Sequence, residues 1–97
     1  MPTARRLVPH RRKVTILNQR GLHARAAAKF VKCAGLHRAE VVVMKDGQKV
    51  SGLSIMGLIT LAAVKGSRIV IAARGPQADA ALAALVALVE DRFGEGE

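Results

Sequence analysis

The period of the hydrophobic pattern changes repeatedly along the chain, and the changes predict four strands and three helices. Residues 14–17 are rich in β-branched side chains, which favours a first strand. From Ala24 to Ala34 the apolar positions recur at helical spacing, with Lys29 and Lys32 on the other side. The further predicted elements are strands 39–45, 48–51 and 68–74, a helix at 55–64, and a last helix that starts at Gly75-Pro76.

Turn and capping residues mark the ends of these elements. Asp46-Gly47 predicts a tight hairpin, and Gly35 is a suitable C-cap for the first helix. Ser54 is a suitable N-cap for the second helix, which Lys65-Gly66 is expected to end. The last helix is expected to bury a stripe formed by Leu82, Leu85, Val86, Val89 and Phe93.

The element order βαββαβα predicts an α+β fold, with an antiparallel four-stranded sheet and three helices packed on one face. The other face should be exposed, which agrees with polar side chains at Thr15, Glu40, Lys45 and Lys49. A chain of 97 residues makes one domain. We predict that domain at 14–93, between a basic, flexible extension at 1–13 and a frayed end at 94–97.

Composition narrows the class of protein. Hydrophobic residues make up 51% of the chain and aromatic residues 2%, so the core must be aliphatic. No apolar run is long enough to cross a bilayer, and the basic start lacks the apolar segment of a secretory signal. The single Cys33 cannot form an internal disulfide. We therefore expect a soluble, monomeric, cytoplasmic protein with no membrane insertion.

The formal net charge of +9 is concentrated at the start of the chain. Five of these charges come from the first thirteen residues, and removing them leaves +4 for the rest. A nucleic-acid-binding domain would need stacking aromatic residues or a dense Lys/Arg face. Neither remains without the extension, so we expect no nucleic acid partner. The basic residues of the extension are Arg5, Arg6, Arg11, Arg12 and Lys13.

The segment most informative about function is Gly21-Leu22-His23-Ala24-Arg25, where a strand gives way to a helix. His23 precedes the helix, so the free amides of Ala24, Arg25 and Ala26 should lie near its ring. A phosphoryl group on the imidazole would meet these amides, the helix dipole and the Arg25 guanidinium. On this feature alone, a histidine that only caps the helix or lies exposed is the slightly favoured alternative.

The predicted second helix carries more apolar surface than one buried stripe needs. Leu58, Leu61 and Ala62 can supply the stripe. The apolar residues left over are Ile55, Met56 and Ile59. This surplus indicates a docking surface for a partner protein, although a more deeply buried helix explains the pattern equally well.

Ser54 adds a regulatory hypothesis, because a phosphate there would add roughly two negative charges beside the apolar surface and could block docking. Other candidate residues have plainer explanations: His10 lies in the extension, His37 follows the first helix, Cys33 packs in it and Asp46 forms the turn. The chain lacks paired carboxylates, a P-loop and a Cys/His cluster. We therefore expect no metal, no cofactor and no stand-alone enzyme.

Three segments resemble HPr, the histidine-containing phosphocarrier of the bacterial phosphoenolpyruvate-dependent phosphotransferase system, including its nitrogen-related version. The segments are Asn18-Gln19-Arg20-Gly21-Leu22-His23-Ala24-Arg25, Ser54-Ile55-Met56-Gly57-Leu58 and Lys65-Gly66-Ser67. Their order and separations also match, and the resemblance covers about residues 14–93. It implies an open-faced β-sandwich and a carrier that is not an enzyme with its own substrate.

The resemblance implies that the phosphohistidine of enzyme I phosphorylates His23 on Nδ1. The group would then pass to a histidine of an enzyme IIA protein, in sugar transport or in nitrogen-related regulation. Arg25 matches the family's active-site arginine, and Ser54 matches the serine modified by HPr kinase/phosphorylase where that kinase exists. The implied contact surface consists of Ile55, Met56 and Ile59 with Ala28 and Lys32.

Two features depart from the family pattern. Ala26 stands where the family usually has proline, so we expect a slightly less rigid but working site. The basic extension precedes the family's usual start. The leading hypothesis is a phosphocarrier, and the alternative is a regulatory module whose binding depends on phosphorylation of His23 or Ser54.

Overall fold

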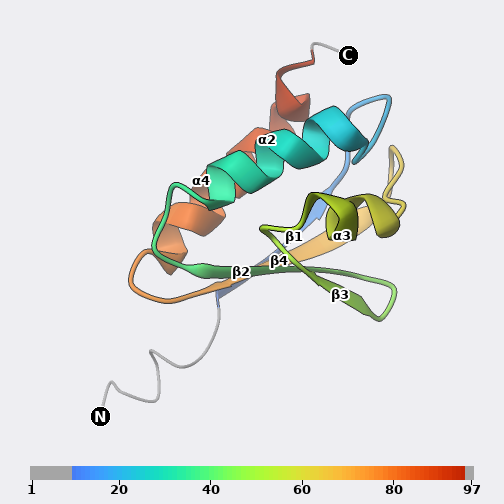
Figure 1. The fold of residues 1–97 in the computed structure, drawn as a ribbon. Helices are drawn as coiled ribbons and strands as arrows, with labels where there is room; N and C mark the ends of the chain where they lie inside the picture. The colour runs from blue at the N-terminus through green and yellow to red at the C-terminus, as the bar shows by residue number, and fades with distance from the viewer. Residues whose placement is uncertain (1–9, 96–97) are drawn as a thin grey trace.

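The computed structural model describes residues 10–95, in which a four-stranded antiparallel sheet carries the helices on one face (Figure 1). The elements are β1 (His10–Thr15), α2 (Ala24–Ala34), β2 (Glu40–Lys45), β3 (Gln48–Ser51), α3 (Ile55–Thr60), β4 (Arg68–Arg74), α4 (Ala78–Glu90) and the short 3-10 helix η1 (Arg92–Gly94). The predicted α+β class and the order βαββαβα are confirmed.

Strand β4 lies inside the sheet, whose order is β1-β4-β2-β3. It pairs with β1 through Val14↔Ile69 and with β2 through Val43↔Ile71. Strict alternation turns these apolar side chains toward the helices, where all four are buried. Ile69 and Ile71 of β4 thus point into the core.

The core between the sheet and the helices is mostly aliphatic, as the composition predicts, and both phenylalanines lie inside it. Phe30 on α2 and Phe93 in η1 are fully buried. The predicted stripe of the last helix is buried at every position, although Phe93 belongs to η1. The hairpin prediction also holds, because Asp46 and Gly47 adopt φ values of 50° and 82°, as a type I′ turn requires.

The first strand begins at His10, four residues before the predicted Val14. Arg11, Arg12 and Lys13 pair with β4 and belong to the sheet, so the predicted domain boundary after residue 13 falls inside β1. An edge strand needs only backbone partners on one side, and charged side chains are common there because they discourage aggregation. Residues 1–9 of the predicted extension lie outside the described residues.

Because these three basic residues belong to the sheet, the charge of the folded part differs from the prediction. Arg11 and Lys13 lie on the open face of the sheet with Lys49, Arg68 and Arg74, so the folded part is more basic than predicted. The open face has a hollow of about 250 Å³ whose charged lining residues are Arg11, Glu40, Lys49 and Arg74. The absence of a nucleic acid partner remains a prediction.

Helix α3 ends at Thr60, four residues before the predicted end. Ala62 has φ 53° and is exposed, so it does not continue the buried stripe that Leu58 and Leu61 form. The chain leaves the helix because the carbonyl of Ala63 accepts a 2.9 Å hydrogen bond from the amide of Leu22. Tertiary contact thus overrides helix propensity.

Both ends of the last helical segment also differ from the prediction. Helix α4 has Gln77 as its N-cap, so Gly75-Pro76 lies in the preceding loop. At the other end, Arg92 and Phe93 adopt positive φ values and turn the chain back toward α2. Within the predicted frayed end 94–97, Glu95 is tied to the fold by side-chain hydrogen bonds.

Candidate functional site

His23 occupies the N-cap position of α2, with extended backbone angles of −77° and −179°. Its ring makes no capping hydrogen bond to the described helix, and its side chain is 21% exposed. The predicted position just before the first helical residue is therefore confirmed. The alternative of a histidine that only caps the helix or lies exposed does not describe this geometry, because the ring makes no cap bond and is largely covered.

The first turn of α2 offers free donors beside this ring. Among residues 10–95, the backbone amides of Ala24, Arg25 and Ala26 have no hydrogen-bond partner, whereas Ala27 donates to the carbonyl of His23 at 2.8 Å. Free amides at a helix N-terminus attract anions. Helix α2 begins at Ala24 with Ala26 in its first turn, so proline is not needed to place His23 at the helix start. A loss of rigidity at Ala26 remains a prediction.

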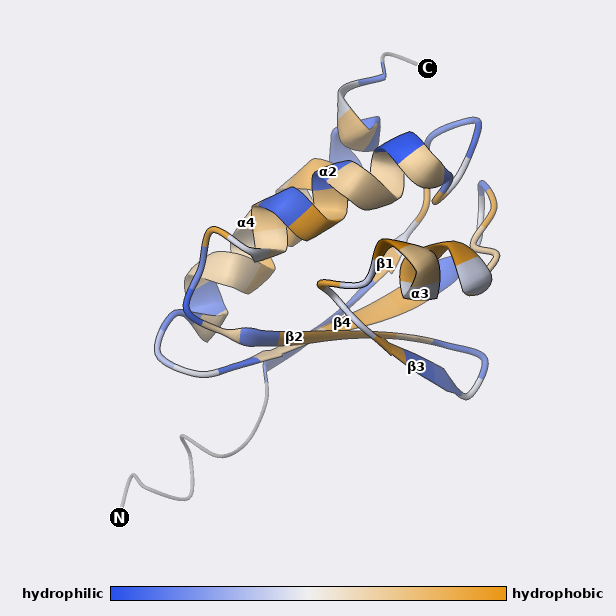
Figure 2. Ribbon diagram, viewed as in Figure 1, coloured by the Kyte–Doolittle hydropathy of each residue, from blue (hydrophilic) through white to orange (hydrophobic). Residues whose placement is uncertain are grey.

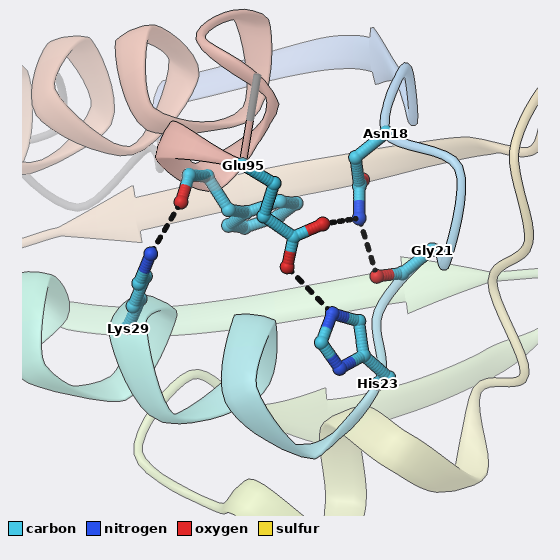
Figure 3. Close-up of polar contacts among 6 residues, drawn as sticks. Asn18, Gly21, His23, Lys29 and Glu95 are labelled. Carbon is cyan, nitrogen blue, oxygen red and sulfur yellow. Dashed lines mark hydrogen bonds and ion pairs between the residues drawn. The ribbon is translucent and has the colours of Figure 1, made fainter. Parts of the chain in front are cut away.

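Glu95 also belongs to the site, although the sequence did not predict it. Its Oε2 lies 2.6 Å from Nε2 of His23, and its Oε1 accepts a 3.1 Å hydrogen bond from Nδ2 of Asn18. Figure 3 shows the carboxylate between these two side chains. The sequence carries no local signal for this contact, because 72 positions separate Glu95 from His23.

The side chain of Glu95 is only 8% exposed. Burial by itself raises the pKa of its carboxyl group. The hydrogen bonds from His23 and Asn18, with the nearby charges of His23 and Lys29, nevertheless hold that pKa below its ordinary value of 4.5. Glu95 is thus a carboxylate at neutral pH.

Three cations share a cleft with this carboxylate. Arg20, Arg25 and Lys29 line a cleft of about 240 Å³ together with Gly94 and Glu95. Lys29 also donates a 2.6 Å hydrogen bond to the carbonyl of Phe93, which ties α2 to the C-terminal turn. The structure therefore brings Arg25 to the site as predicted and adds Arg20 and Lys29, so an anion at the ring would meet concentrated positive charge.

Exposed apolar side chains form a surface beside the site, which we call the apolar patch. Its members are Leu53, Ile55, Met56 and Val64. Met56 is 69% exposed, so the alternative of a deeply buried second helix does not hold. Figure 2 shows that much of α3 has the colour of hydrophobic residues. Gly21 packs against the backbone of Val64, so the patch continues to the loop that carries His23.

The structure separates the predicted contact residues into two groups. Ala28 and Lys32 are exposed on α2, and Ile55 and Met56 are exposed on α3. Ile59 differs from the prediction of surplus surface, because it is half-buried and packs against the core. Leu53 and Val64 extend the exposed surface beyond the residues that the sequence predicted.

Ser54 is the N-cap of α3, as predicted. Its Oγ accepts a 2.9 Å hydrogen bond from the amide of Gly57, and its side chain is half-buried between Leu53 and Ile55. A phosphate on this oxygen would therefore lie within the apolar patch.

The remaining candidates have structural partners. His37 Nδ1 lies 3.1 Å from the carbonyl oxygen of Cys33, and His10 pairs with Asp79 at 3.2 Å. Burial raises the pKa of the Cys33 thiol. Across residues 10–95, no group of three His, Cys, Asp or Glu side chains could hold a metal ion. Nor does this part of the chain contain a helix long and apolar enough to cross a membrane.

Comparison with known proteins links this geometry to a family. A family model described as "PTS HPr component phosphorylation site" matches residues 10–91. The chain is 45% identical over 86 residues to the phosphocarrier protein HPr of Cupriavidus necator, covering 89% of this chain and 97% of that protein. It is 43% identical over 84 residues to the phosphocarrier protein NPr of Shewanella violacea, covering 87% and 92%.

A solved structure agrees with the fold as well. The crystal structure of HPr-C-His from Thermoanaerobacter tengcongensis superposes with a TM-score of 0.85 at 40% sequence identity. The match covers 89% of this chain and 97% of that one. The likeness thus extends across both the sheet and the helices.

Proposed function

Because this chain belongs to the HPr family of phosphocarrier proteins of the phosphotransferase system, we propose that His23 is its phosphoryl acceptor. The phosphohistidine of enzyme I supplies the group, and a histidine of an enzyme IIA protein takes it. The protein works as a monomeric cytoplasmic carrier, in sugar transport or in nitrogen-related regulation.

One observation carries this proposal: the position of the His23 ring between Glu95 and the start of α2. Nε2 faces the carboxylate, and the ring makes no capping hydrogen bond to the described helix that would occupy Nδ1. A phosphoryl group on Nδ1 would be stabilised by the free amides of Ala24, Arg25 and Ala26 and by the Arg25 guanidinium.

The chemistry explains why a carrier needs histidine here. A neutral imidazole nitrogen is a nucleophile near pH 7, and a phosphorylated ring that bears a proton on its other nitrogen is a good leaving group. The same side chain therefore accepts the group and gives it up. The protein is an intermediate of the relay and not a stand-alone catalyst.

The apolar patch supports docking of both partners on one surface. A partner that covers Met56 and Val64 buries apolar area and approaches the loop of Gly21, which leads directly into His23. Ala28 and Lys32 lie on the exposed side of α2 and extend this surface. Donor and acceptor must then bind alternately.

Incubation with enzyme I, Mg²⁺ and labelled phosphoenolpyruvate tests the proposal. We expect an acid-labile phosphate on the wild type and none on His23→Ala. His37→Ala is the matched control, because His37 lies near the other end of α2 and bonds to a backbone carbonyl. An unlabelled wild type would refute the carrier function, and label on His23→Ala would refute the site.

A second candidate function is regulation through Ser54, and its cap geometry favours it. A phosphate on Oγ would stay near the start of α3 but would place roughly two negative charges within the apolar patch. With HPr kinase/phosphorylase and ATP, we expect an acid-stable phosphate that is lost in Ser54→Ala. Transfer from enzyme I should then slow in the modified protein. Unchanged transfer would contradict this regulatory role.

A further inference from the structure

The hydrogen bonds around His23 form a chain with one direction, which begins at a backbone carbonyl. Asn18 is fully buried, and its Nδ2 donates to the carbonyl of Gly21 at 2.8 Å and to Oε1 of Glu95 at 3.1 Å. A backbone carbonyl can only accept, so it fixes which way the Asn18 amide points. The amide in turn requires an acceptor at Oε1 of Glu95.

The second oxygen of Glu95 continues the chain to the imidazole. An ionised carboxylate has no proton to donate, so the 2.6 Å contact between Oε2 and Nε2 of His23 needs a proton on Nε2. The neutral ring then has its lone pair on Nδ1. Figure 3 shows this sequence of contacts from Gly21 through Asn18 and Glu95 to His23.

The C-terminal turn that presents Glu95 is held in place at a conformational cost. Arg92 and Phe93 both adopt left-handed backbone angles, with φ of 55° and 54°, which non-glycine residues rarely do. Burial of the Phe93 ring and the 2.6 Å bond from Lys29 to its carbonyl hold the turn against α2. These contacts place the Glu95 carboxylate at the ring.

We propose that Glu95 is a positioning residue for phosphoryl transfer, which with Asn18 keeps the proton of His23 on Nε2 and so leaves Nδ1 free as the nucleophile. This inference rests on the proposed function and adds a residue to its machinery. In the reaction, the Nδ1 lone pair forms a bond to phosphorus while the phosphorus–nitrogen bond to the donor imidazole breaks. The released electron pair returns to the donor ring.

Throughout this step the proton stays on Nε2 of His23, so the phosphorylated ring carries a positive charge. Glu95 supplies the compensating negative charge at hydrogen-bond distance. Retention of this proton also prepares the return step, because a protonated ring leaves phosphorus more readily. Arg20, Arg25 and Lys29 in the same cleft offset the repulsion between Glu95 and the phosphoryl oxygens.

The Glu95→Gln variant gives a specific prediction, because the hydrogen bond from Asn18 fixes the orientation of the new amide. The amide oxygen of glutamine must face Nδ2 of Asn18, which turns its NH₂ group toward Nε2 of His23. Nε2 would then have to accept, and the proton would move to Nδ1. The nearly isosteric glutamine should therefore impair the site more than Glu95→Ala, which removes the contact altogether.

Two measurements test whether Glu95→Gln moves the ring proton and whether it impairs the site more than Glu95→Ala does. Long-range ¹H–¹⁵N spectra of the unphosphorylated protein near pH 8.5, above the ordinary histidine range, report which ring nitrogen carries the proton. We expect Nε2–H in the wild type and mainly Nδ1–H in Glu95→Gln. With enzyme I and phosphoenolpyruvate, we expect kcat for Glu95→Gln to fall at least about tenfold with little change in KM, and Glu95→Ala to lose less.

Glu90→Gln is the matched control, because Glu90 is exposed on α4, and it should resemble the wild type in both measurements. The inference is overturned by an Nε2–H tautomer in Glu95→Gln, or by phosphorylation of that variant at the wild-type rate. The spectra need no phosphoryl donor, so they stand even if the wild type accepts no phosphate. A labelled wild type with an unchanged tautomer would overturn only the role of Glu95.

Discussion

Gly21 lies against Ala63 so closely that a Cβ atom on Gly21 would come within 2.4 Å of the Ala63 carbonyl oxygen. Gly21 also has φ 66°, and the next amide, that of Leu22, donates to the same carbonyl at 2.9 Å. The loop that presents His23 is therefore held by the backbone that follows α3.

This contact predicts that Gly21→Ala is more destabilising than its backbone angle alone would make it. Gly66→Ala is the matched control, because Gly66 also has a positive φ but a Cβ there meets nothing within 4 Å. We expect Gly66→Ala to lose about 1 kcal/mol of unfolding free energy, for the left-handed angle alone. Gly21→Ala should lose roughly 2–4 kcal/mol in urea unfolding, because overpacking adds to that penalty. Equal losses would contradict the contact.

The cap of α3 predicts a substitution pattern at Ser54. Ser54→Ala removes the acceptor for the Gly57 amide and should lower the unfolding free energy by about 1 kcal/mol. Ser54→Asp keeps an acceptor at the cap and should lose much less. Thermal or urea unfolding measures both variants, and equal destabilisation would show that the hydrogen bond is not what stabilises this helix start.

The apolar patch predicts a defect in partner binding without a defect in folding. Met56→Lys should raise the KM for transfer from enzyme I roughly tenfold, since loss of a buried apolar anchor is worth about 1–2 kcal/mol. Leu36→Lys is the control, because Leu36 is 75% exposed but follows the far end of α2 from His23. A similar change in both variants would argue against a specific patch.

The Glu95 network predicts a dependence of stability on pH. The folded-state pKa of Glu95 lies below 4.5, so its contribution is present above that value and is lost as the pH falls through the folded-state pKa. The difference in unfolding free energy between the wild type and Glu95→Gln should therefore be present just above pH 4.5 and shrink as the pH falls through the folded-state pKa of Glu95. Urea unfolding across this range measures it. A difference that grows in acid would contradict the sign.

The periodicity of the sequence predicted most of the fold because the elements concerned bury one regular face. Strands β3 and β4 and helix α2 have the predicted bounds, and Ile69 and Ile71 of β4 are fully buried. The pattern could not locate the start of β1, since residues 10–13 have exposed side chains and are held by backbone pairing with β4.

The sequence also predicted where His23 would lie, because a glycine loop followed by a helical pattern defines the N-cap locally. In the same way, it predicted that the free amides of the first turn and the guanidinium of Arg25 would lie near the ring. These features depend on neighbours within a few positions, so local rules of capping and helix geometry are sufficient.

Only the tertiary structure decided what orients the ring and what lies beside it. Glu95 meets His23 because two left-handed residues reverse the chain after α4, and α3 ends early because Ala63 bonds to Leu22. Such contacts join segments tens of residues apart and leave no periodic trace in the sequence. They are selected by packing of the whole core, so the acceptor histidine could be predicted from the sequence whereas its orienting carboxylate could not.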